Sequence, residues 1–231
     1  MNPNRREKKR TATLEEIRET AWKQIADQGV NALSLRGIAR EMGMTAPALY
    51  RYHKDRDALV TALLIDAFSA FTIALERGRD LRATQDHAGR FRAMCRSYFE
   101  WARQNPQRYA LMFGTPIPSH LFASELGPVA QRSFLVLQGV IGEAHKAGFI
   151  SGEKAAVRLP PGLRSRYDAL KKMGMPYTPL VTHLALSVWS TMHGITSLYL
   201  YQYLAGFLTE NVESFVDFEI ERIARMIGLV P

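Results

Sequence analysis

The sequence predicts an all-α protein, in which a small N-terminal three-helix domain precedes a larger helical domain, with about nine helices in all. Apolar residues recur three and four positions apart along most of the chain, which is the period of an amphipathic helix. No segment shows the alternating pattern of a half-buried strand. Glycine follows several of the periodic runs, as is typical of helix ends. The 231 residues can hold one large domain or a small domain joined to a bigger one.

Positive charge gathers at the N-terminus. Residues 1–10 hold five basic side chains and one acidic side chain, a net charge of +4 out of +8 for the whole chain. They show no apolar periodicity, so we expect residues 1–12 to form a disordered basic arm that binds phosphates or a minor groove. A solvated tail is the alternative. The basic residues of the arm are Arg5, Arg6, Lys8, Lys9 and Arg10.

The first helix is predicted from Thr13 to Gln28. Thr13 and Glu16 have the spacing of a capping box, in which each side chain bonds the other's backbone N–H. Gly29 follows the last periodic residue and ends the helix. Its buried stripe consists of Ile17, Ala21, Ile25 and Ala26.

Two short helices separated by a tight turn are predicted between Leu33 and Val60. Ser34 is placed to cap the first one by accepting a hydrogen bond from the free backbone donors of its first turn. Gly43 stands where a left-handed backbone ends a helix at little steric cost. The apolar stripe of this helix consists of Leu35, Ile38, Ala39 and Met42.

The second short helix is predicted to begin after Thr45 as its N-cap. Pro47 falls in the first turn, where its missing N–H costs no internal hydrogen bond. Leu49 and Tyr52 should face back toward the first helix. The residues left on the outward side are Ala46, Pro47, Ala48 and Arg51.

An ordinary helical hairpin is the alternative interpretation, because two short helices around a glycine are common. Compact outward residues, however, let a helix come close enough to base edges to read them. Tyr50, Arg51 and Lys54 stand beside these residues. The combination favours a DNA-binding helix-turn-helix in a domain over residues 13–56.

Residues 57–231 are predicted to form the larger helical domain. Asp55 should cap a long helix over 56–78 that links the two domains. The segment 148–179 is basic and rich in proline and glycine, so we expect a long loop with at most one short helix near 165–173. Further helices are expected over 85–104, 105–113, 120–147, 180–206 and 211–228.

The middle helices carry more aromatic bulk than a plain bundle requires. A mostly apolar cavity with a few polar tips would suit a small lipophilic effector. A packed core explains the same residues equally well, and for Trp189 and His193 it is the better explanation. The candidate effector residues are Phe91, Met94, Tyr98, Met112, Phe113, Phe122, Phe134, Trp189, His193 and Tyr199.

The polar residues form no recognisable catalytic or metal-binding pattern. The six histidines include no HExxH pair, and no nucleophile elbow or phosphate-binding glycine loop is present. The single cysteine, Cys95, excludes an intrachain disulfide framework and a multi-cysteine zinc site. We therefore expect no cofactor, no metal and no catalysis, with an α-helical enzyme as a remote alternative. The lack of a signal segment and of a run of about eighteen apolar residues predicts a cytoplasmic protein.

Residues 13–62 resemble the tetracycline-repressor-like (TetR) family of bacterial transcription regulators. The similar features are Ile-Ala near the end of the second helix, Gly-Met-Thr at the turn and Leu-Tyr-x-Tyr after it. His53 departs from the family, which usually has phenylalanine at this position. The resemblance implies a homodimer whose two heads enter successive major grooves of a palindromic operator. It also implies a response to a small molecule.

The resemblance further indicates which side chains meet DNA. Arg36 is expected to reach a base edge, and Ser34 suits a phosphate contact. Tyr50, Tyr52 and Lys54 suit phosphate contacts as well. The residues that open the recognition helix and face the groove are Thr45, Ala46, Pro47 and Ala48. Since alanine has no hydrogen-bonding side chain, we expect specificity to come from thymine methyl contacts, the neighbouring arginines and DNA shape.

Trp189, His193 and Gly194 resemble the Trp-x3-His-Gly signature of one subgroup of the family's C-terminal domains. A glycine inside a helix costs about 1 kcal/mol against alanine, which indicates close helix packing or room for a ligand. The resemblance implies a dimer surface on the last two helices. Its apolar candidates are Leu184, Val188, Ile195, Phe215, Ile220 and Ile223. The expected function is that of a ligand-responsive repressor, and a non-specific nucleoid-type DNA-binding protein is the alternative.

Overall fold

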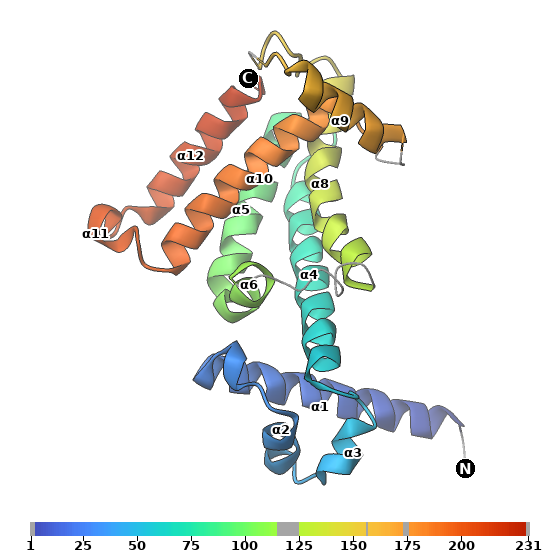
Figure 1. Ribbon diagram of the computed structural model, residues 1–231. Helices are drawn as coiled ribbons and strands as arrows, with labels where there is room; N and C mark the ends of the chain where they lie inside the picture. Colours follow the sequence, from blue (N-terminus) through green and yellow to red (C-terminus); the bar gives the residue numbers. More distant parts are fainter. Residues whose placement is uncertain (1–2, 115–124, 156, 173–175, 230–231) are drawn as a thin grey trace. The chain divides into compact units, whose positions relative to one another are not determined.

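The computed structural model describes residues 3–114, 125–155, 157–172 and 176–229, and all regular elements in these ranges are helices (Figure 1). The predicted all-α fold is confirmed. The helices are α1 (Pro3–Gln28), α2 (Leu35–Glu41), α3 (Ala46–Tyr50), α4 (Arg56–Asp80), α5 (His87–Gln104), α6 (Pro106–Phe113), α8 (Gly127–Lys146), α9 (Pro161–Lys172), α10 (Pro179–Leu200), α11 (Ala205–Leu208) and α12 (Val212–Met226). A single 3-10 turn, η1 (Val30–Ala32), precedes α2.

The chain folds into two compact units. The head unit comprises Met1–Phe68 and Asn105–Gly127, and the body unit comprises Ser69–Gln104 and Pro128–Pro231. The helix α4 therefore contributes residues to both units, and α6 belongs to the head. The predicted domain boundary at residue 56 does not coincide with a boundary between these units, because the first turns of α4 carry buried leucines of the head.

The basic N-terminal residues are helical, so the prediction of a disordered arm over residues 1–12 was wrong for the residues described. The helix α1 begins at Pro3 rather than at Thr13. Thr13 is an interior residue, whose Oγ1 donates to the carbonyl oxygen of Lys9 at 3.0 Å, so it does not cap the helix. Arginine, lysine, glutamate and alanine are good helix formers, and no glycine or proline interrupts residues 4–12.

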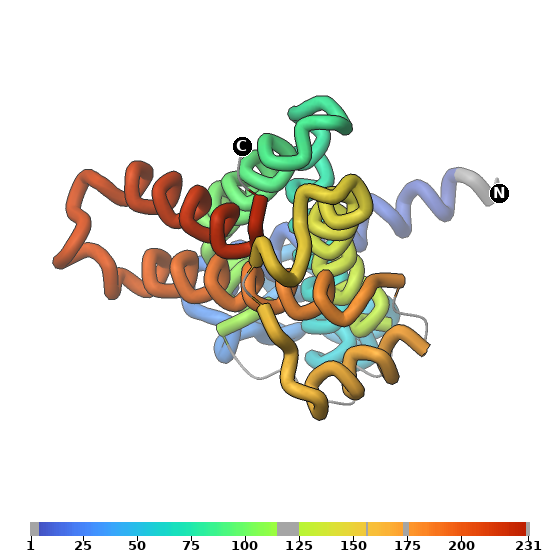
Figure 2. The backbone as a smooth tube through the Cα atoms, turned by 90° about the horizontal axis from the view of Figure 1, so that it is seen from above, coloured from blue at the N-terminus to red at the C-terminus, as the bar shows by residue number. Residues whose placement is uncertain are grey.

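Three boundaries of later helices also differ from the predicted ones. The helix α8 begins at Gly127, and residues 120–124 of the predicted helix lie outside the described residues. The helix α9 corresponds to the short helix predicted near 165–173, but it begins earlier, at Pro161, and ends at Lys172. The helix α10 ends at Leu200 because Gln202 adopts a positive φ of 64°, which no helix tolerates. The short α11 then leads into α12, which lies beside α10 (Figures 1 and 2).

The long helix α4 is unusually apolar. Its most apolar window of 18 residues has a mean hydropathy of 2.1, which by length and composition alone would suffice to cross a membrane. We predicted no apolar run of about eighteen residues, but this window of α4 has that length and is apolar on average. Apolar core helices pass the same test, and Leu59, Leu63, Phe71 and Leu75 of α4 are buried. Asp66, in the middle of the window, pairs with Arg108 at 2.8 Å.

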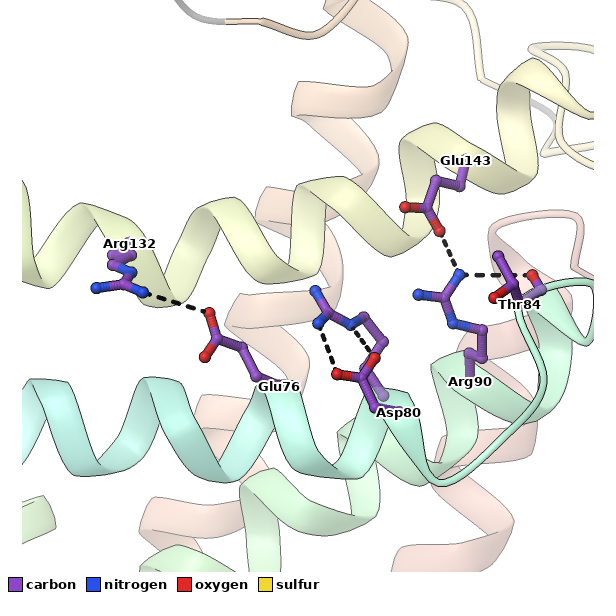
Figure 3. A network of polar contacts seen from close by, with 7 residues as sticks. Glu76, Asp80, Thr84, Arg90, Arg132 and Glu143 are labelled. Carbon is purple, nitrogen blue, oxygen red and sulfur yellow. Dashed lines mark hydrogen bonds and ion pairs between the residues drawn. The ribbon is translucent and has the colours of Figure 1, made fainter.

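Charged side chains connect α4, α5 and α8 within the body unit (Figure 3). Arg90 of α5 is 5% exposed and pairs with Glu143 of α8. The same guanidinium nitrogen lies 3.5 Å from the carbonyl oxygen of Thr84, in the loop before α5. Glu76 of α4 faces Arg132 of α8 at 3.8 Å. A buried charge is tolerated only when it is paired, so this cluster fixes the start of α5 against α8.

Candidate nucleic-acid interface

The helix α2 begins with a side-chain cap, as predicted. Ser34 has an extended backbone, and its Oγ accepts a hydrogen bond from the backbone nitrogen of Gly37 at 3.3 Å. Its own backbone nitrogen donates to Oε1 of Gln24 on α1 at 2.7 Å. Two of the backbone donors at the start of α2 are thus satisfied, and one of the bonds ties α2 to α1.

The turn between α2 and α3 depends on Gly43, as predicted. Gly43 has a φ of +65°, in the left-handed region. The backbone nitrogen of Met44 donates to the carbonyl oxygen of Ala39 at 2.8 Å, and that of Gly43 donates to Arg40 at 3.2 Å. This pair of bonds is a Schellman motif, which satisfies the last carbonyls of the helix and reverses the chain.

The helix α3 presents small and polar residues on its exposed side. Thr45 is the N-cap residue, as predicted, although its side chain makes no capping hydrogen bond. Pro47 lies in the first turn and is exposed, as are Thr45 and Arg51. Leu49 is fully buried, and Tyr50 is 41% exposed. The leading edge of α3 is therefore an open surface, held in place by one buried leucine. The partly exposed residues of this region are Ala46, Ala48 and Tyr52.

Arg56, at the start of α4, holds the segment that leads into α2. Its Nη2 donates to the carbonyl oxygen of Val30 at 2.8 Å, and its Nε donates to that of Leu33 at 3.2 Å. Asp55 caps α4 as predicted, because its Oδ1 accepts from the backbone nitrogen of Ala58 at 2.7 Å. The two consecutive residues thus position both the start of α4 and the entry to α2.

A second polar cluster joins α1, α4 and α6 in the head unit. Nη1 of Arg108 on α6 lies 2.8 Å from Oδ2 of Asp66 on α4. The Arg108 guanidinium also lies over the ring of Trp22 on α1, 4.8 Å from its centroid, which is a cation–π contact. The sequence did not predict the roles of Gln24, Arg56 and Arg108, because their partners are distant in the sequence.

His53, just after α3, is 8% exposed, so it packs inside the head as the family's phenylalanine would. Burial lowers the pKa of its imidazole below the ordinary value of 6.5, and a hydrogen bond with the backbone of Ala58 offsets this only in part. The imidazole is therefore neutral near pH 7. Its Nε2 has no partner among the described residues.

The charges predicted to meet DNA are exposed. Arg36 and Lys54 are exposed in the helix-turn-helix, next to exposed Ser34. The basic residues of the N-terminal turns of α1 are exposed as well; they are Arg5, Arg6, Lys8, Lys9 and Arg10. The head therefore has an open edge of small and polar residues on α3 and exposed cations on other parts of its surface, and binding to phosphates requires such cations.

Comparison with known proteins identifies this arrangement. The family model for bacterial regulatory proteins of the tetR family matches residues 17–63, and the model for the tetracyclin repressor-like C-terminal domain matches residues 91–223. The HTH-type transcriptional regulator Rv1816 of Mycobacterium tuberculosis is 33% identical over 202 residues, which cover 84% of this chain and 83% of the relative. The chain belongs to the TetR family of transcription regulators.

Solved structures agree with this assignment. The crystal structure of the regulatory protein SCO4313 is 31% identical, with a TM-score of 0.73, and the match covers 94% of this chain and 97% of the other. The regulator FadR from Bacillus subtilis, solved with stearoyl-CoA, shares the fold at 12% identity and a TM-score of 0.66, covering 94% and 99%. The protein is a DNA-binding transcription regulator of the TetR type, and the nucleoid-type alternative is not favoured.

The predicted effector residues of this TetR-family chain fall into separate groups. Met112 and Phe113 belong to the head unit. The Phe113 ring packs 5.8 Å from Phe68 and 4.9 Å from Tyr109, measured between ring centroids. Phe122 lies outside the described residues. The head residues are therefore packed against head neighbours.

A second group lies on α5 in the body core. The Tyr98 ring meets Phe71 of α4 edge-on at 4.9 Å, and Tyr199 of α10 lies 5.0 Å from Phe99. The two other predicted residues of α5, Phe91 and Met94, are buried at 0% and 2% exposure. Tight aromatic contacts of this kind are those of a packed core.

The third group lies along α8 and α10. The Phe134 ring is 5.9 Å from Trp189, which in turn is 6.3 Å from His193. Burial lowers the pKa of His193 below its ordinary value. A Cβ at Gly194 would meet nothing within 4 Å, so packing inside the chain's described residues does not explain that glycine. Of the three groups this one lies nearest to the surface, since Trp189 is 37% exposed.

An open cleft of about 560 Å³ lies between α5, α12 and the loop that joins α4 to α5. Arg92 pairs with Glu221 across it at 3.0 Å, and Arg96 pairs with Asp217 at 2.8 Å. None of the predicted effector residues lines this cleft. Its polar lining is largely occupied by these ion pairs.

Five of the six apolar residues predicted for the dimer surface are buried in the chain's own core. Leu184, Val188, Ile195, Ile220 and Ile223 are at most 8% exposed, and only Phe215 is half-buried. Other apolar residues of α10, α11, α12 and their connections are exposed instead: Leu198 (45%), Tyr201 (46%), Tyr203 (68%), Phe207 (85%), Phe218 (64%) and Met226 (37%). Periodicity finds the apolar side of a helix, but it does not tell which residues meet the body and which stay open.

Metal and thiol chemistry have no visible site here. In the part of the chain that the structure describes, no three His, Cys, Asp or Glu side chains are placed to hold a metal ion. Cys95 is 2% exposed, and burial raises the pKa of its thiol well above the usual range. A buried neutral thiol packs as a small hydrophobe.

Proposed function

We propose that this TetR-family regulator is a homodimeric repressor, which binds a palindromic operator in the cytoplasm and leaves it when a small lipophilic effector binds. The observation that carries the DNA-binding part is the geometry of α3. Its leading edge is open while Leu49 alone anchors it to the head core. Such an edge can enter a major groove without any change in the packing of the head core.

The helix-turn-helix side chains that were predicted to meet DNA receive the following roles in this proposal. Arg36 reads a base edge with its guanidinium, and Arg51 supports it from the end of α3. Tyr50, Tyr52 and Lys54 bind phosphates and fix the register. The small residues at the reading edge contact thymine methyl groups; they are Thr45, Ala46, Pro47 and Ala48.

The basic turns of α1 add phosphate contacts. Because they are helical, they cannot thread into a minor groove as a flexible arm would. A rigid basic helix instead adds charge along the sugar-phosphate backbone, which raises affinity for all sequences alike. We assign this role to Arg5, Arg6, Lys8, Lys9 and Arg10.

The proposed dimer surface is the exposed apolar face of α10, α11 and α12. Phe207 and Phe218 are its most exposed phenylalanines, at 85% and 64%. Large exposed apolar patches mark interaction sites in soluble proteins, and we assign the exposed aromatic residues of these helices to such a patch. A second copy of the chain, with the same face, forms a closed pair in which both heads are available for two half-sites.

The ligand response follows by linkage. An effector that prefers a head spacing unlike that of two successive major grooves lowers operator affinity, and operator lowers effector affinity by the same factor. The stearoyl-CoA complex of FadR is an example of a lipophilic ligand on this fold. Equal effector affinity with and without operator would exclude this scheme.

The most direct test selects bound DNA from a random pool with the purified protein. The proposal predicts one enriched palindrome, whose affinity exceeds that of random DNA by at least about a thousandfold at physiological salt. Enrichment of no sequence, together with a steep salt dependence, would indicate a non-specific DNA-binding protein instead. Repeating the selection with candidate ligands identifies the effector.

A further inference from the structure

We call the line of contact between α8 and α10 the seam. Three contacts lie along it, and their order along α8 is the reverse of their order along the segment that ends in α10. Phe134 meets Trp189, Gln138 meets Thr182, and Gly142 meets Tyr177 just before α10. The helices are therefore antiparallel neighbours in the body unit (Figures 1 and 2). The middle and the far end of this seam contain two features that apolar packing does not explain.

The first feature is a buried glutamine whose hydrogen bonding is incomplete. Gln138 is 0% exposed, and its Nε2 donates to Oγ1 of Thr182 at 3.2 Å. Its Oε1 is buried and has no partner among the described residues. Burying an amide oxygen without a hydrogen-bond donor is unfavourable, and a leucine of similar size would avoid that cost. The position is thus equipped to accept one hydrogen bond.

The second feature is a flat notch made by two glycines of α8. A Cβ added at Gly142 would lie 2.7 Å from Cε1 of Tyr177, and one added at Gly139 would lie 3.4 Å from its hydroxyl oxygen. Only glycine leaves room for the aromatic ring at Gly142. The notch begins one residue after Gln138 and fits the phenol ring of a tyrosine. The side chain of Tyr177 fills it in this structure.

The side chain of Tyr177 can leave this notch without unfolding a helix. It is half-buried and stands in the segment before Thr178, the N-cap residue of α10, so it belongs to no helix itself. Burial and the neighbouring Glu143 both raise the pKa of its hydroxyl, which keeps the ring neutral. Glu143 also makes this end of the seam unfavourable for an anion.

We propose that the seam is the effector site, and that it binds a planar aromatic molecule with a neutral hydrogen-bond donor. The ligand's ring takes the notch from Tyr177, and its donor bonds to Oε1 of Gln138. Displacing Tyr177 moves the first turn of α10, the helix that carries part of the proposed dimer surface. The proposal rests on the ligand-responsive function above and adds the chemical class of the ligand.

The test compares phenol with anisole, its methyl ether, which has the same ring but no donor. Titration of the full-length protein, followed by calorimetry, is expected to show phenol binding about tenfold more tightly than anisole. Gln138→Leu should remove that difference and leave anisole binding unchanged. Gln138→Met serves as a second variant if the leucine protein does not fold. Tyr177→Ala should bind phenol more tightly than the natural protein, whereas Phe149→Ala, which removes an exposed aromatic ring elsewhere in the body unit, should not.

Phenol should also lower the affinity of the natural protein, but not of Gln138→Leu, for the selected operator. Equal binding of phenol and anisole, unchanged preference in the Gln138 variants, or binding only to Tyr177→Ala would each overturn the site. Phenol binding without any effect on operator affinity would overturn its role as effector site. In all these cases the regulator function still holds if the natural protein binds its operator in the absence of ligand. If the natural protein binds no DNA sequence specifically, that function is contradicted instead.

Discussion

Oε1 of Gln24 on α1 accepts a hydrogen bond from the backbone nitrogen of Ser34, 2.7 Å away, at the N-cap of α2. A side chain of the first helix thus holds the entry to the helix-turn-helix. Nε2 of the same side chain lies where a Cβ at Gly37 would come within 2.7 Å, so Gln24 and Gly37 fit against each other. The orientation of α2 depends on this pair of residues as well as on its apolar stripe.

Gln24→Ala should loosen the start of α2. Because one hydrogen bond to a backbone donor is lost, we expect the free energy of unfolding to fall by about 1 kcal/mol and operator affinity to fall about threefold or more. Urea denaturation and operator titration measure the two effects. Gln28→Ala, at the exposed end of the same helix, should change stability by less than about 0.5 kcal/mol. Equal effects of the two substitutions would contradict a specific role for Gln24.

Stability should fall on mild acidification because of His53. Its folded-state pKa lies below 6.5, so under pH 6.5 the unfolded chain takes up a proton that the folded chain resists. Stability is therefore fully present above pH 6.5 and decreases as pH falls toward the lower folded-state pKa. His193 shifts in the same direction and adds to the effect.

His53→Phe, the family's usual residue, should reduce this acid sensitivity. We expect its free energy of unfolding at pH 7.5 to lie within about 1 kcal/mol of the natural protein, because the ring fills the same buried space. The loss between pH 7.5 and pH 5.5, measured by urea denaturation, should be smaller than in the natural protein. An identical loss in both proteins would show that His53 does not titrate on unfolding.

Cys95 should be unreactive in the native protein. Burial keeps its thiol neutral, and the thiolate is the form that reacts with disulfide reagents. We expect modification by an aromatic disulfide at pH 8 to be slower than in the urea-unfolded chain by at least about a hundredfold. Comparable rates would mean that α5 opens readily.

Substitutions in the head should separate affinity from sequence choice. Tyr50→Ala and Lys54→Ala should weaken operator and random DNA alike, and the lysine change should flatten the slope of log affinity against log salt by about 0.9. Arg36→Ala should instead change which sequence is selected. Lys172→Ala, at the exposed end of α9, is the charge-matched control and should alter neither property.

Phe218→Glu should disrupt the proposed dimer. A charge placed in the middle of an apolar interface is expected to raise the dimer dissociation constant by at least about tenfold, which sedimentation measures. Ile73→Glu is the matched control, since Ile73 is 46% exposed but lies on α4. A natural protein that sediments as a monomer at micromolar concentration would reject the dimer itself.

Local signals in the sequence predicted the helix-turn-helix because the interactions that form it span only a few residues. The cap at Ser34, the left-handed Gly43 and the early Pro47 all act within one turn of themselves. The same reasoning failed at Thr13, where a capping motif was overridden by good helix formers on both sides. Local signals indicate where a helix can start, but the helix propensity of the neighbouring residues determines which start the chain adopts.

The sequence by itself determined that this chain is helical, where its recognition helix begins and that it belongs among DNA-binding regulators. Tertiary structure alone decided that Leu184 is core while Phe218 is open, that Gln24 and Arg56 hold the entry to α2, and that Gln138 carries a buried oxygen in need of a donor. The physical reason is that helical periodicity fixes which side of a helix is apolar. Which neighbour covers that side depends on residues far away in the chain.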